Sequence, residues 1–187
     1  MDVPSVDDNK IALLYSGGLD SCVLLSLALR LKYQPFCILV DYGQVHKAEL
    51  SYAERLCSEL KVPYEKVKVV LPVSSKLTDG EQKYEGVSEW YVPSRNLIFI
   101  GLAASLAEDR GIHTIWYGPN YEDRENEFPD CVQEWVFRAN QLLEVNGSTP
   151  LRLEAPLLGM SKPFIKRLAS DLHITEDMVL SGYGEAE

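Results

Sequence analysis

The sequence predicts an α/β fold: a five-stranded, mostly parallel sheet with helices on both of its faces. Short apolar runs alternate with longer helical segments along most of the chain, which is the pattern of parallel β-α-β units. The length of 187 residues, with 46% hydrophobic and 25% charged residues, suits one globular domain. Because no repeat or linker-like stretch interrupts this pattern, we expect residues 1–187 to form a single domain with flexible tails at 1–9 and 181–187.

Each expected strand is a short apolar or alternating run. The first, 10–15, is the run KIALLY before a Gly-Gly pair, and the second, 35–41, is PFCILVD before Tyr-Gly. The third, 64–70, alternates and is rich in valine. The fourth, 113–118, and the fifth, 151–155, each follow a helical segment, as β-α-β units require.

The helices between these strands are expected from apolar spacing near 3.6 residues per turn. Residues 21–31 are apolar almost all round, which predicts a helix packed on both sides, whereas 47–60 are amphipathic. Small residues in 94–109 suit close packing against the sheet. Pro129 predicts the first position of a helix over 129–145, and 161–172 form the last helix.

Two segments without regular periodicity are expected to be loops. Residues 71–93 exceed the ~12–15 residues that are usual for a loop in a compact domain, and such loops are commonly functional or disordered. Residues 121–128 are highly charged and predict a second loop.

Charge and cysteine content exclude several classes of function. With 18 Lys and Arg against 28 Asp and Glu, the net charge of −10 argues against stable nucleic-acid binding, which needs clustered basic residues. Cys22, Cys37, Cys57 and Cys131 form no C-x-x-C pair, and the first three lie in apolar runs, so we expect these three to be buried thiols. Neither a signal peptide nor an apolar stretch near ~20 residues occurs, so we expect a cytoplasmic protein without membrane contact.

The strongest local motif joins the first expected strand to the first expected helix: Ser16-Gly17-Gly18-Leu19-Asp20-Ser21. Glycines let a backbone approach a phosphate closely, and a helix N-terminus directs N–H groups at it. Asp20 is a poor phosphate ligand by itself, but it could fix the loop or hold Mg²⁺ against phosphates. The alternative is an ordinary strand-to-helix turn capped by Ser and Asp.

The SGG-x-DS pattern resembles the pyrophosphate loop of the adenine-nucleotide α-hydrolase families, which split ATP between its α and β phosphates. Further blocks follow in the chain: VDYGQ at 40–44, YVPSRN at 91–96, FPDC at 128–131 and SK at 161–162. Together these blocks resemble the 7-cyano-7-deazaguanine synthase family. The resemblance extends over residues 10–168, most of the chain.

This resemblance implies a Rossmann-like fold and an ATP-dependent C–N ligase of queuosine biosynthesis. ATP would adenylate the carboxylate of 7-carboxy-7-deazaguanine, ammonia would displace AMP to give an amide, and a second ATP would convert the amide into the nitrile. No protein nucleophile is required, so catalysis would rest on positioning and charge stabilisation. The implied partners are small molecules: ATP with Mg²⁺, the deazaguanine and ammonia.

The resemblance also implies roles for individual residues. Asp20, Arg95 and Lys162 are the expected catalytic residues, and Asp20 is also the expected Mg²⁺ ligand. The residues expected to bind the nucleotide are Ser16, Gly17, Gly18, Leu19, Asp20, Ser21, Asp41, Tyr42, Gly43, Gln44 and Gly118. The residues expected to bind the deazaguanine are Tyr91, Arg95, Asp123, Phe128 and Asp130, with Asp130 reading the guanine-like edge and Tyr91 or Phe128 stacking on the base.

Each of these assignments has an ordinary structural alternative. Arg95 could be a surface ion-pair residue, Asp130 could complement a helix dipole, and Lys162 could be a solvated lysine. His46 could equally be a capping or core residue. We expect the tryptophans to pack in the interior rather than to stack on a ligand: Trp90, Trp116 and Trp135.

The sequence departs from the family pattern at a few positions. Val45 and Val132 stand where the family has arginine, which removes positive charge near the expected ligands, and Leu19 stands where a glutamine-like residue is usual. Family members also carry four C-terminal cysteines that bind a structural zinc, and Gly182 stands where the first of them would be. We therefore expect no zinc site, and the sequence leaves open whether the nitrile is formed.

Three other functions stay open. A sibling ligase could stop at the amide or join the deazaguanine to another amine. A non-catalytic nucleotide-binding protein is a second alternative, against which Asp20, Arg95 and Lys162 argue. A tRNA-modifying sulfurtransferase would need a basic surface and a reactive cysteine, which the charge and the apolar settings of the cysteines disfavour. The sequence also leaves the oligomeric state open, a homodimer included.

Overall fold

The computed structural model describes residues 9–45, 48–73, 75, 77–78, 91–125, 128–175 and 178–179. Residues 1–8 of the expected N-terminal tail (1–9) lie outside these residues, as do the expected C-terminal tail at 181–187, His46 and Trp90. The strands are β1 (Lys10–Leu14), β2 (Gln34–Asp41), β3 (Tyr64–Lys68), β4 (Thr114–Trp116) and β5 (Arg152–Glu154). The helices are α1 (Leu19–Arg30), α2 (Ala48–Glu59), α3 (Arg95–Asp109), α4 (Tyr121–Glu125), α5 (Gln133–Asn146) and α6 (Lys162–Asp171).

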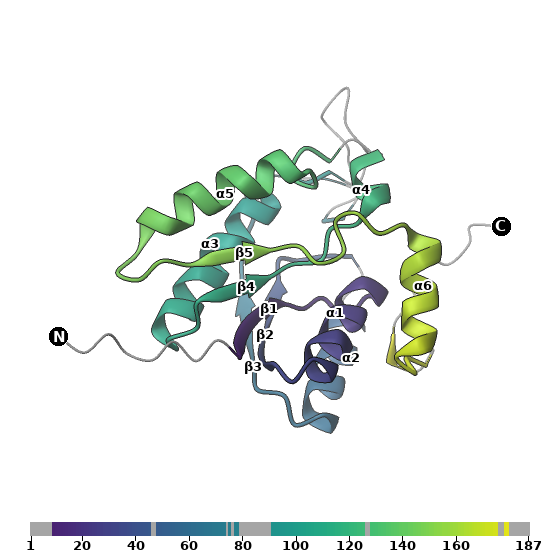
Figure 1. Ribbon diagram of the computed structural model, residues 1–187. Coiled ribbons are helices and arrows are strands. Elements are labelled where there is room, and N and C mark those ends of the chain that lie inside the picture. The colour runs from purple at the N-terminus through teal and green to yellow at the C-terminus, as the bar shows by residue number, and fades with distance from the viewer. Residues whose placement is uncertain are drawn as a thin grey trace.

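The five strands form one all-parallel sheet in the order β3-β2-β1-β4-β5 (Figure 1). The central strand β1 pairs with β2 and with β4, so that Leu13 lies opposite Cys37 on one side and Trp116 on the other. The chain runs outward from β1 to β3 and then crosses to the other side of β1 for β4 and β5. Ligands of open α/β sheets bind at the carboxyl ends of the strands where the order reverses, which here is beside β1 and β4.

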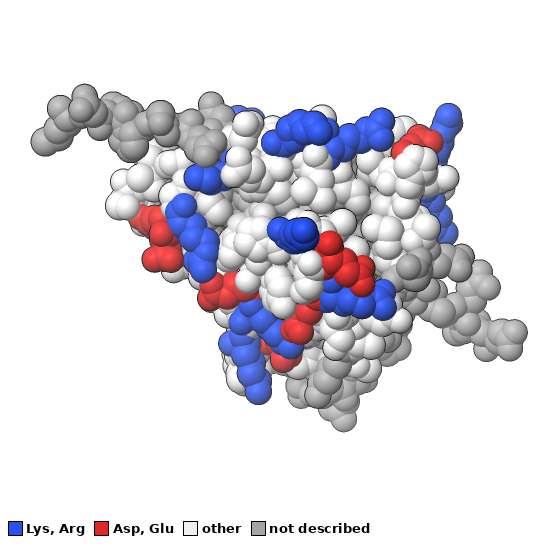
Figure 2. All heavy atoms as spheres, turned by 90° about the horizontal axis from the view of Figure 1, so that it is seen from below, with Lys and Arg blue, Asp and Glu red and all other residues white. Residues whose placement is uncertain are grey.

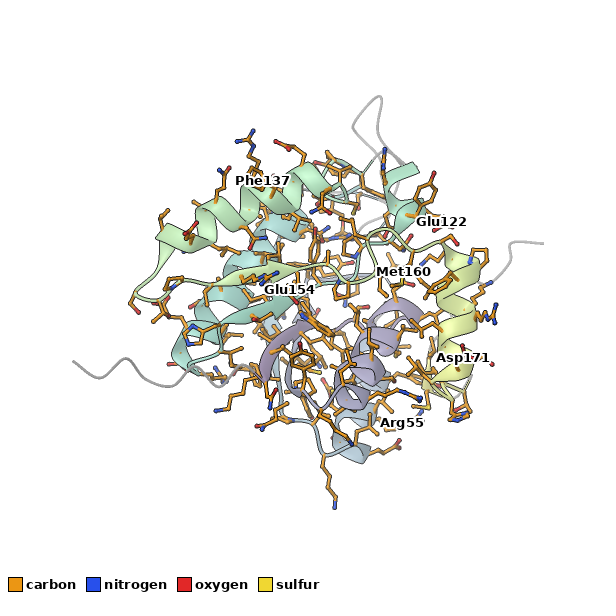
Figure 3. The ribbon with its side chains drawn as sticks, in the orientation of Figure 1. Arg55, Glu122, Phe137, Glu154, Met160 and Asp171 are labelled. Atoms are coloured by element: carbon orange, nitrogen blue, oxygen red, sulfur yellow. The ribbon has the colours of Figure 1, made fainter. Side chains whose placement is uncertain are left out.

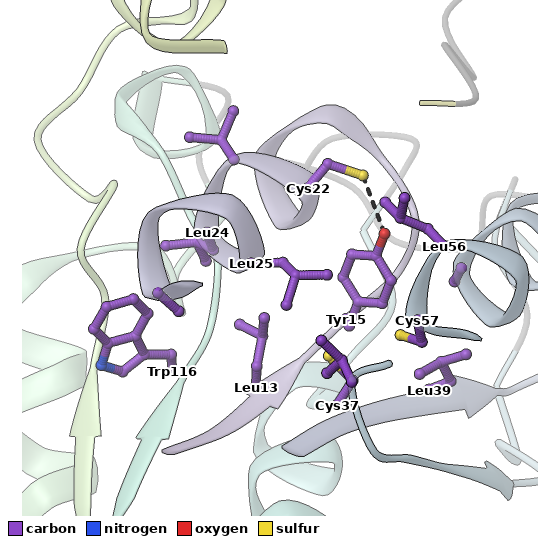
Figure 4. Packing of buried hydrophobic residues seen from close by; sticks show 14 of the residues in the cluster. Leu13, Tyr15, Cys22, Leu24, Leu25, Cys37, Leu39, Leu56, Cys57 and Trp116 are labelled. Atoms are coloured by element: carbon purple, nitrogen blue, oxygen red, sulfur yellow. Dashed lines mark hydrogen bonds between the residues drawn. The ribbon is translucent and has the colours of Figure 1, made fainter. Parts of the chain in front are cut away.

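Successive residues of β1 face opposite sides of the sheet, and each side has its own hydrophobic core. Ile11 and Leu13 belong to the core beneath α1, α2 and α6, whereas Ala12 belongs to the core beneath α3 and α5. The helices therefore cover both faces, as Figure 1 shows. In the first core, side chains of α1, α2 and β2 surround Tyr15 (Figure 4). The predicted α/β fold is confirmed, and the sheet is parallel throughout because a crossover that contains a helix connects each pair of consecutive strands.

The segment after β4 folds differently from the sequence expectation. Residues 121–125 form the short helix α4 where the charge pattern predicts a loop. That prediction is wrong because the side-chain oxygen of Asn120 accepts hydrogen bonds from the N–H groups of Glu122 and Asp123, at 2.9 and 3.2 Å. These bonds cap a helical turn and satisfy N–H groups that a helix start leaves unpaired.

Helix α5 begins at Gln133 and not at Pro129. Pro129 and Asp130 lie in a turn before the helix, where the hydroxyl of Tyr117 donates to the main-chain carbonyl of Asp130 at 3.3 Å. The predicted helix start is therefore wrong by a turn. Asp130 also lies outside the first turn of α5, so the alternative that it complements the dipole from within that turn does not hold.

Side-chain burial corrects one helix face and confirms the expected packing of two tryptophans. Trp116 lies edge-on to Tyr33 with ring centroids 5.2 Å apart, and Trp135 lies 6.0 Å from the ring of Tyr117. The amphipathic pattern of 47–60, which covers α2, places Ala48 and Leu60 near the apolar face with Ala53, Leu56 and Cys57, but Ala48 and Leu60 are exposed in the structure. The buried residues of that helix are Leu50, Ala53, Leu56 and Cys57.

The surface of the fold carries charges of both signs. Figure 2 shows basic and acidic side chains interspersed on the face seen from below. Ion pairs such as Lys66–Glu54, at 2.6 Å, connect neighbouring elements. Across the described ranges, none of the helices combines the length and the apolar character that crossing a bilayer requires.

Leu13 tests the predicted central position of β1. Its side chain is fully buried in the first core, so we expect Leu13→Ala to lower the free energy of unfolding by ~2–5 kcal/mol, the usual cost of a cavity in a core. Leu142→Ala is the matched control, because Leu142 is 53% exposed on α5 and its truncation should change stability by less than ~0.5 kcal/mol. Urea unfolding measures both, and equal effects would contradict the placement of β1.

Candidate active site

The candidate active site lies at the carboxyl ends of β1, β2 and β4, beside the reversal of strand order. The turn between β1 and α1 contains the predicted phosphate loop, and α1 begins at Leu19. The residue before it, Gly18, has an extended backbone (φ −76°, ψ 167°), and no side-chain hydrogen bond caps the helix. A helix N-terminus without a side-chain cap can direct its first N–H groups at an anion.

The hydroxyl of Ser21 holds the phosphate loop together from inside. It accepts hydrogen bonds from the N–H groups of Gly17 at 3.1 Å and Ser16 at 3.3 Å, and it donates to the carbonyl of Gly18 at 2.9 Å. The hydroxyl of Ser16 is 3.1 Å from the same oxygen. Ser21 is buried whereas Ser16 is exposed, so Ser21 shapes the loop and Ser16 can meet a ligand.

Two glycines allow the close approaches that the site requires. Gly17 has φ +86°, and a Cβ atom built on it would lie 2.6 Å from the carbonyl oxygen of Glu49 in α2. Gly118, after β4, would place a Cβ atom 3.2 Å from Leu24 of α1. The phosphate loop therefore packs closely against α2, and the end of β4 packs directly against α1.

The thiols near the loop are structural. The hydroxyl of Tyr15 is 3.2 Å from the sulfur of Cys22, and burial raises the pKa of Cys22 to about 11. The pKa of Cys37 is raised well above its ordinary value by its hydrogen bond with Cys57 and by burial. The expected burial of these three cysteines is confirmed, and Cys131 is buried as well. Neutral, buried thiols are poor nucleophiles, which agrees with a reaction that needs no covalent step on the protein.

Asp20 and Lys162 form an ion pair at the mouth of the loop. The ammonium of Lys162, at the start of α6, contacts Oδ2 of Asp20 in the first turn of α1. The side chain of Lys162 is 36% exposed and that of Asp20 is 20% exposed, so the pair is partly shielded from water. Oδ1 of Asp20 is buried and has no hydrogen-bond partner among the residues that the structure describes. The alternative that Lys162 is an unpaired, solvated lysine is wrong.

Two residues that the sequence did not single out connect this ion pair to α4. The side-chain amide of Asn120 donates to Oδ2 of Asp20 at 3.0 Å. The carboxylate of Glu122 accepts the main-chain N–H of Lys162 at 2.8 and 2.9 Å, and so caps the start of α6 (Figure 3). Asn120 lies three residues before Asp123, which is the spacing of a capping box at a helix start. This spacing was the signal in the sequence that could have indicated α4.

Arg95 begins α3 on the other side of the site. Its guanidinium lies 5.8 Å from the ring centroid of Tyr42, which in turn packs on Phe99 at 5.3 Å. The residue before it, Ser94, has φ +55°. Arg95 lies near enough to Asp123 for its charge to favour the ionised carboxylate there. The structure thus brings Arg95 close to the predicted deazaguanine-binding residues, whereas Lys162 lies at the phosphate loop.

The turn after β2 is closed by its own side chains. The carboxylate of Asp41 accepts the N–H of Gly43 at 3.2 Å, and the side-chain oxygen of Gln44 accepts the N–H of Tyr42 at 3.0 Å. Gln44 is buried and its amide also donates to the carbonyl of Val40 at 3.4 Å. The predicted nucleotide-binding residues therefore lie at the carboxyl edge of the sheet, and the side chain of Gln44 is engaged in shaping the turn.

The predicted deazaguanine-binding residues gather beyond β4. The rings of Tyr91 and Phe128 are tilted toward each other with centroids 6.4 Å apart. Asp130 is buried, and one of its carboxylate oxygens lies 3.7 Å from the sulfur of Cys131. Asp123 accepts the main-chain N–H of Asn120 at 2.9 Å, so its carboxylate already takes part in capping α4.

A cavity of about 450 Å³ lies outside this cluster, between α4 and α6. It is lined by Tyr121, Gly159, Met160, Ser161 and Phe164. None of these is a predicted ligand-binding residue, although Ser161 adjoins Lys162. Figure 3 labels Met160, which lies in the loop that leads into α6.

The donor set of the site suits a magnesium ion held together with phosphates. Mg²⁺ is commonly bound by one or two carboxylates and by the phosphates of a nucleotide. Asp20 offers one buried carboxylate oxygen without a partner, which fits that mode. Within the described part of the chain, no group of three or more His, Cys, Asp and Glu side chains could hold a metal by itself.

Solved structures define the class of this fold. The chain is similar to an ammonia-dependent NAD synthetase from Campylobacter jejuni, with a TM-score of 0.57, 18% identity, and coverage of 97% of this chain and 72% of that one. It is also similar to the U34-tRNA thiolase NcsA from Methanococcus maripaludis, with a TM-score of 0.60 and 17% identity. That match covers 97% of this chain and 61% of the thiolase. The protein thus shares its α/β fold with these two enzymes.

The chain belongs to the family described as queuosine biosynthesis protein QueC, which it matches over residues 10–187. It is 34% identical to the 7-cyano-7-deazaguanine synthase of Stutzerimonas stutzeri, over 95% of this chain and 85% of that protein. It is also 34% identical to 7-cyano-7-deazaguanine synthase 2 of Colwellia psychrerythraea, over 82% of this chain and 74% of that protein. The family resemblance predicted from the motifs is confirmed.

Gly17→Ala tests the fit of the phosphate loop against α2. The positive φ and the approach of the Glu49 carbonyl should both strain the variant, and we expect it to lose roughly 1–3 kcal/mol of stability. Gly159→Ala is the control, because a Cβ atom there meets nothing within 4 Å and Gly159 has no positive φ. Thermal unfolding of both variants measures the difference. If Gly17→Ala unfolds at the same temperature as the parent, then the loop is free to move away from α2.

Asp123→Asn tests the cost of the half-buried carboxylate. Desolvation raises the pKa of Asp123 above its ordinary value and outweighs the hydrogen bond from Asn120 and the charge of Lys162. The folded state therefore binds this proton more tightly than the unfolded state, so the ionised carboxylate costs stability above its raised pKa and this cost disappears as the pH falls. We expect Asp123→Asn to be more stable than the parent near neutral pH, because the amide oxygen can still accept the N–H of Asn120.

The difference in stability between Asp123→Asn and the parent should shrink as the pH falls toward ~4. Urea unfolding at several pH values measures it. Asp171→Asn, at an exposed position in α6, is the control and should show no such trend. A pH-independent difference for Asp123→Asn would contradict the assigned cause.

Proposed function

We propose that this protein is an ATP-dependent 7-cyano-7-deazaguanine synthase that converts 7-carboxy-7-deazaguanine and ammonia into the nitrile. The observation that carries the proposal is the phosphate loop that opens onto the Asp20–Lys162 pair, in a chain of the QueC family. The names of the relatives supply the product, 7-cyano-7-deazaguanine, and the substrate is the one that the family resemblance implies. The loop supplies the means to bind the phosphates of ATP.

The proposed reaction has two activation steps. A carboxylate oxygen of the substrate attacks the α-phosphorus of ATP and pyrophosphate leaves, which gives an acyl-adenylate. Ammonia attacks the acyl carbon, AMP leaves, and a proton is released as the amide forms. The amide oxygen attacks a second ATP, pyrophosphate leaves again, and loss of AMP and of both amide protons yields the nitrile. AMP is the leaving group that makes both carbon–oxygen bonds breakable.

The phosphate loop and Lys162 bind the part of ATP that becomes pyrophosphate. The N-terminus of α1 and the hydroxyl of Ser16 meet the phosphate oxygens, and Lys162 adds a point charge where negative charge grows. Asp20 would hold Mg²⁺ through its Oδ1 atom, and the chemistry that such an ion would supply is neutralisation of charge on the departing pyrophosphate. The turn that contains Asp41, Tyr42 and Gly43 lies where the nucleoside part of ATP would sit.

The base binds on the other side of β4. Asp130 is a buried carboxylate and is suited to accept hydrogen bonds from the ring N–H and the exocyclic amine of the deazaguanine. The rings of Tyr91 and Phe128 provide apolar surface for stacking, and Arg95 directs positive charge toward the reacting carboxylate. The base and the triphosphate therefore approach from the two sides of the strand-order reversal, which brings the carboxylate to the α-phosphorus.

A sibling ligase that stops at the amide is the second candidate. Two arginines of the family pattern are replaced here by uncharged side chains. Val45 is 56% exposed beside the β2 turn, and Val132 precedes α5. Weaker anion binding near the substrate would affect the second activation most, since it repeats the chemistry on a less nucleophilic group. The remaining proposals are a cytoplasmic location, small molecules as partners in place of nucleic acid, and a homodimer as one option for the assembly.

Release of AMP tests the function directly. We expect the purified protein to release AMP and pyrophosphate from Mg²⁺–ATP only when both 7-carboxy-7-deazaguanine and ammonia are present. Mass spectrometry of the product distinguishes the nitrile from the amide, which is heavier by one water. Absence of substrate-dependent AMP release would refute the proposal, and accumulation of the amide with excess ATP would favour the sibling ligase.

Lys162→Ala tests the role of the ion pair in the same assay. Loss of one preorganised charge at the phosphates should reduce turnover by ~10²–10³-fold. Lys166→Ala is the control, because Lys166 is an exposed lysine one turn further along α6. Equal rates for the two variants would exclude Lys162 from the chemistry.

A further inference from the structure

Asn120 is a fully buried polar residue whose side chain has only one consistent orientation. Its side-chain oxygen accepts the N–H groups of Glu122 and Asp123, so its amide nitrogen must face Asp20. The reverse orientation would place the oxygen against a carboxylate and the NH₂ group against two N–H donors. The direction of the Asn120–Asp20 hydrogen bond therefore follows from the surrounding contacts.

This hydrogen bond decides which oxygen of Asp20 is left without a partner among the described residues. Oδ2 receives both the amide of Asn120 and the ammonium of Lys162, whereas Oδ1 is buried without a hydrogen-bond partner. Lys162 is a long and partly exposed side chain that can leave Asp20 for an incoming phosphate. Asn120 cannot leave in this way, because α4 and Asp123 hold both its side chain and its main chain.

We infer that Asn120 is a positioning residue that fixes the Asp20 carboxylate so that Oδ1 faces Mg²⁺–ATP while Lys162 turns to the phosphates; the inference rests on the proposed function. Neutrality is an advantage here, because an amide donates to the carboxylate without adding a second cation for the phosphates to attract. Partners that orient a ligand-binding carboxylate typically contribute ~10–100-fold to affinity or activity. Asn120 acts through Asp20 and does not itself touch the nucleotide.

Asn120→Asp separates this role from the capping of α4. The new carboxylate keeps an oxygen that can accept the N–H groups of Glu122 and Asp123, so the helix cap is retained. It loses the donor to Asp20 and places a like charge beside it. We expect the affinity for Mg²⁺–ATP, measured by calorimetry, to fall by ~10–100-fold.

The Asp20→Asn background provides the decisive comparison. If Asn120 acts only through Asp20, then Asn120→Asp should change the Mg²⁺–ATP affinity of Asp20→Asn by less than ~2-fold, because contacting residues that work as a unit are not additive. Asn140→Asp is the matched control. Asn140 also bridges two elements with its amide, contacting Val136 and Leu153, but it lies away from the phosphate loop. It should lower the unfolding temperature and leave the affinity unchanged.

The outcomes separate this inference from the proposed function. A similar loss of affinity in both backgrounds, or no loss in the parent background, would overturn the positioning role. If the double-variant result is as expected but the protein releases no AMP with the deazaguanine, then the proposed substrate is wrong and the positioning of Asp20 stands. Failure of the parent protein to bind Mg²⁺–ATP would overturn both.

Discussion

The ion pair between Asp20 and Lys162 is the contact on which the organisation of the candidate site depends. The two residues are 142 positions apart in the chain. Asp20 lies in the first turn of α1 and Lys162 begins α6, and both helices cover the same face of the sheet. Both side chains are partly shielded from water, so each charge offsets part of the desolvation penalty of the other. The pair holds a cation beside the phosphate loop and leaves one carboxylate oxygen unused. A single contact therefore brings together the positive and the negative group that the proposed magnesium–nucleotide complex would use.

The parallel sheet makes this contact geometrically possible. All five strands point the same way, so the turns after β1, β2 and β4 open onto one edge. The two cores, one on each face of the sheet, are closely packed, and the alternating side chains of the strands hold them in register. The loops at the carboxyl edge can then be short and internally hydrogen-bonded, as Ser21 shows in the phosphate loop and Gln44 in the turn after β2. Rigid supports of this kind suit a reaction that relies on positioning and not on a protein nucleophile.

Most of the fold was predictable because its signals are local. The apolar runs of β1 and β2, the amphipathic spacing of α2 and the Gly-Gly turn each depend on residues within a few positions of one another. The prediction was wrong for α4, where capping decided the result, and for the start of α5, which a turn precedes. Charged residues in 121–125 predict a loop, but the side chain of Asn120 satisfies the N–H groups that a helix start leaves unpaired. Pro129 is compatible with a helix start, yet the turn to which it belongs is held by Tyr117 from another strand end.

The sequence by itself determined the class of the protein, the position of the phosphate loop and the family, because motifs and periodicity are written along the chain. Only the tertiary structure decided how the site is connected. Asn120 meets Asp20 across 100 residues and Glu122 meets Lys162 across 40, and neither residue carries a motif that reveals its partner. The availability of Oδ1 on Asp20 is likewise a property of the assembled site. Such facts depend on which donors surround an atom in space, and that arrangement exists only after distant β-α units have packed on one sheet.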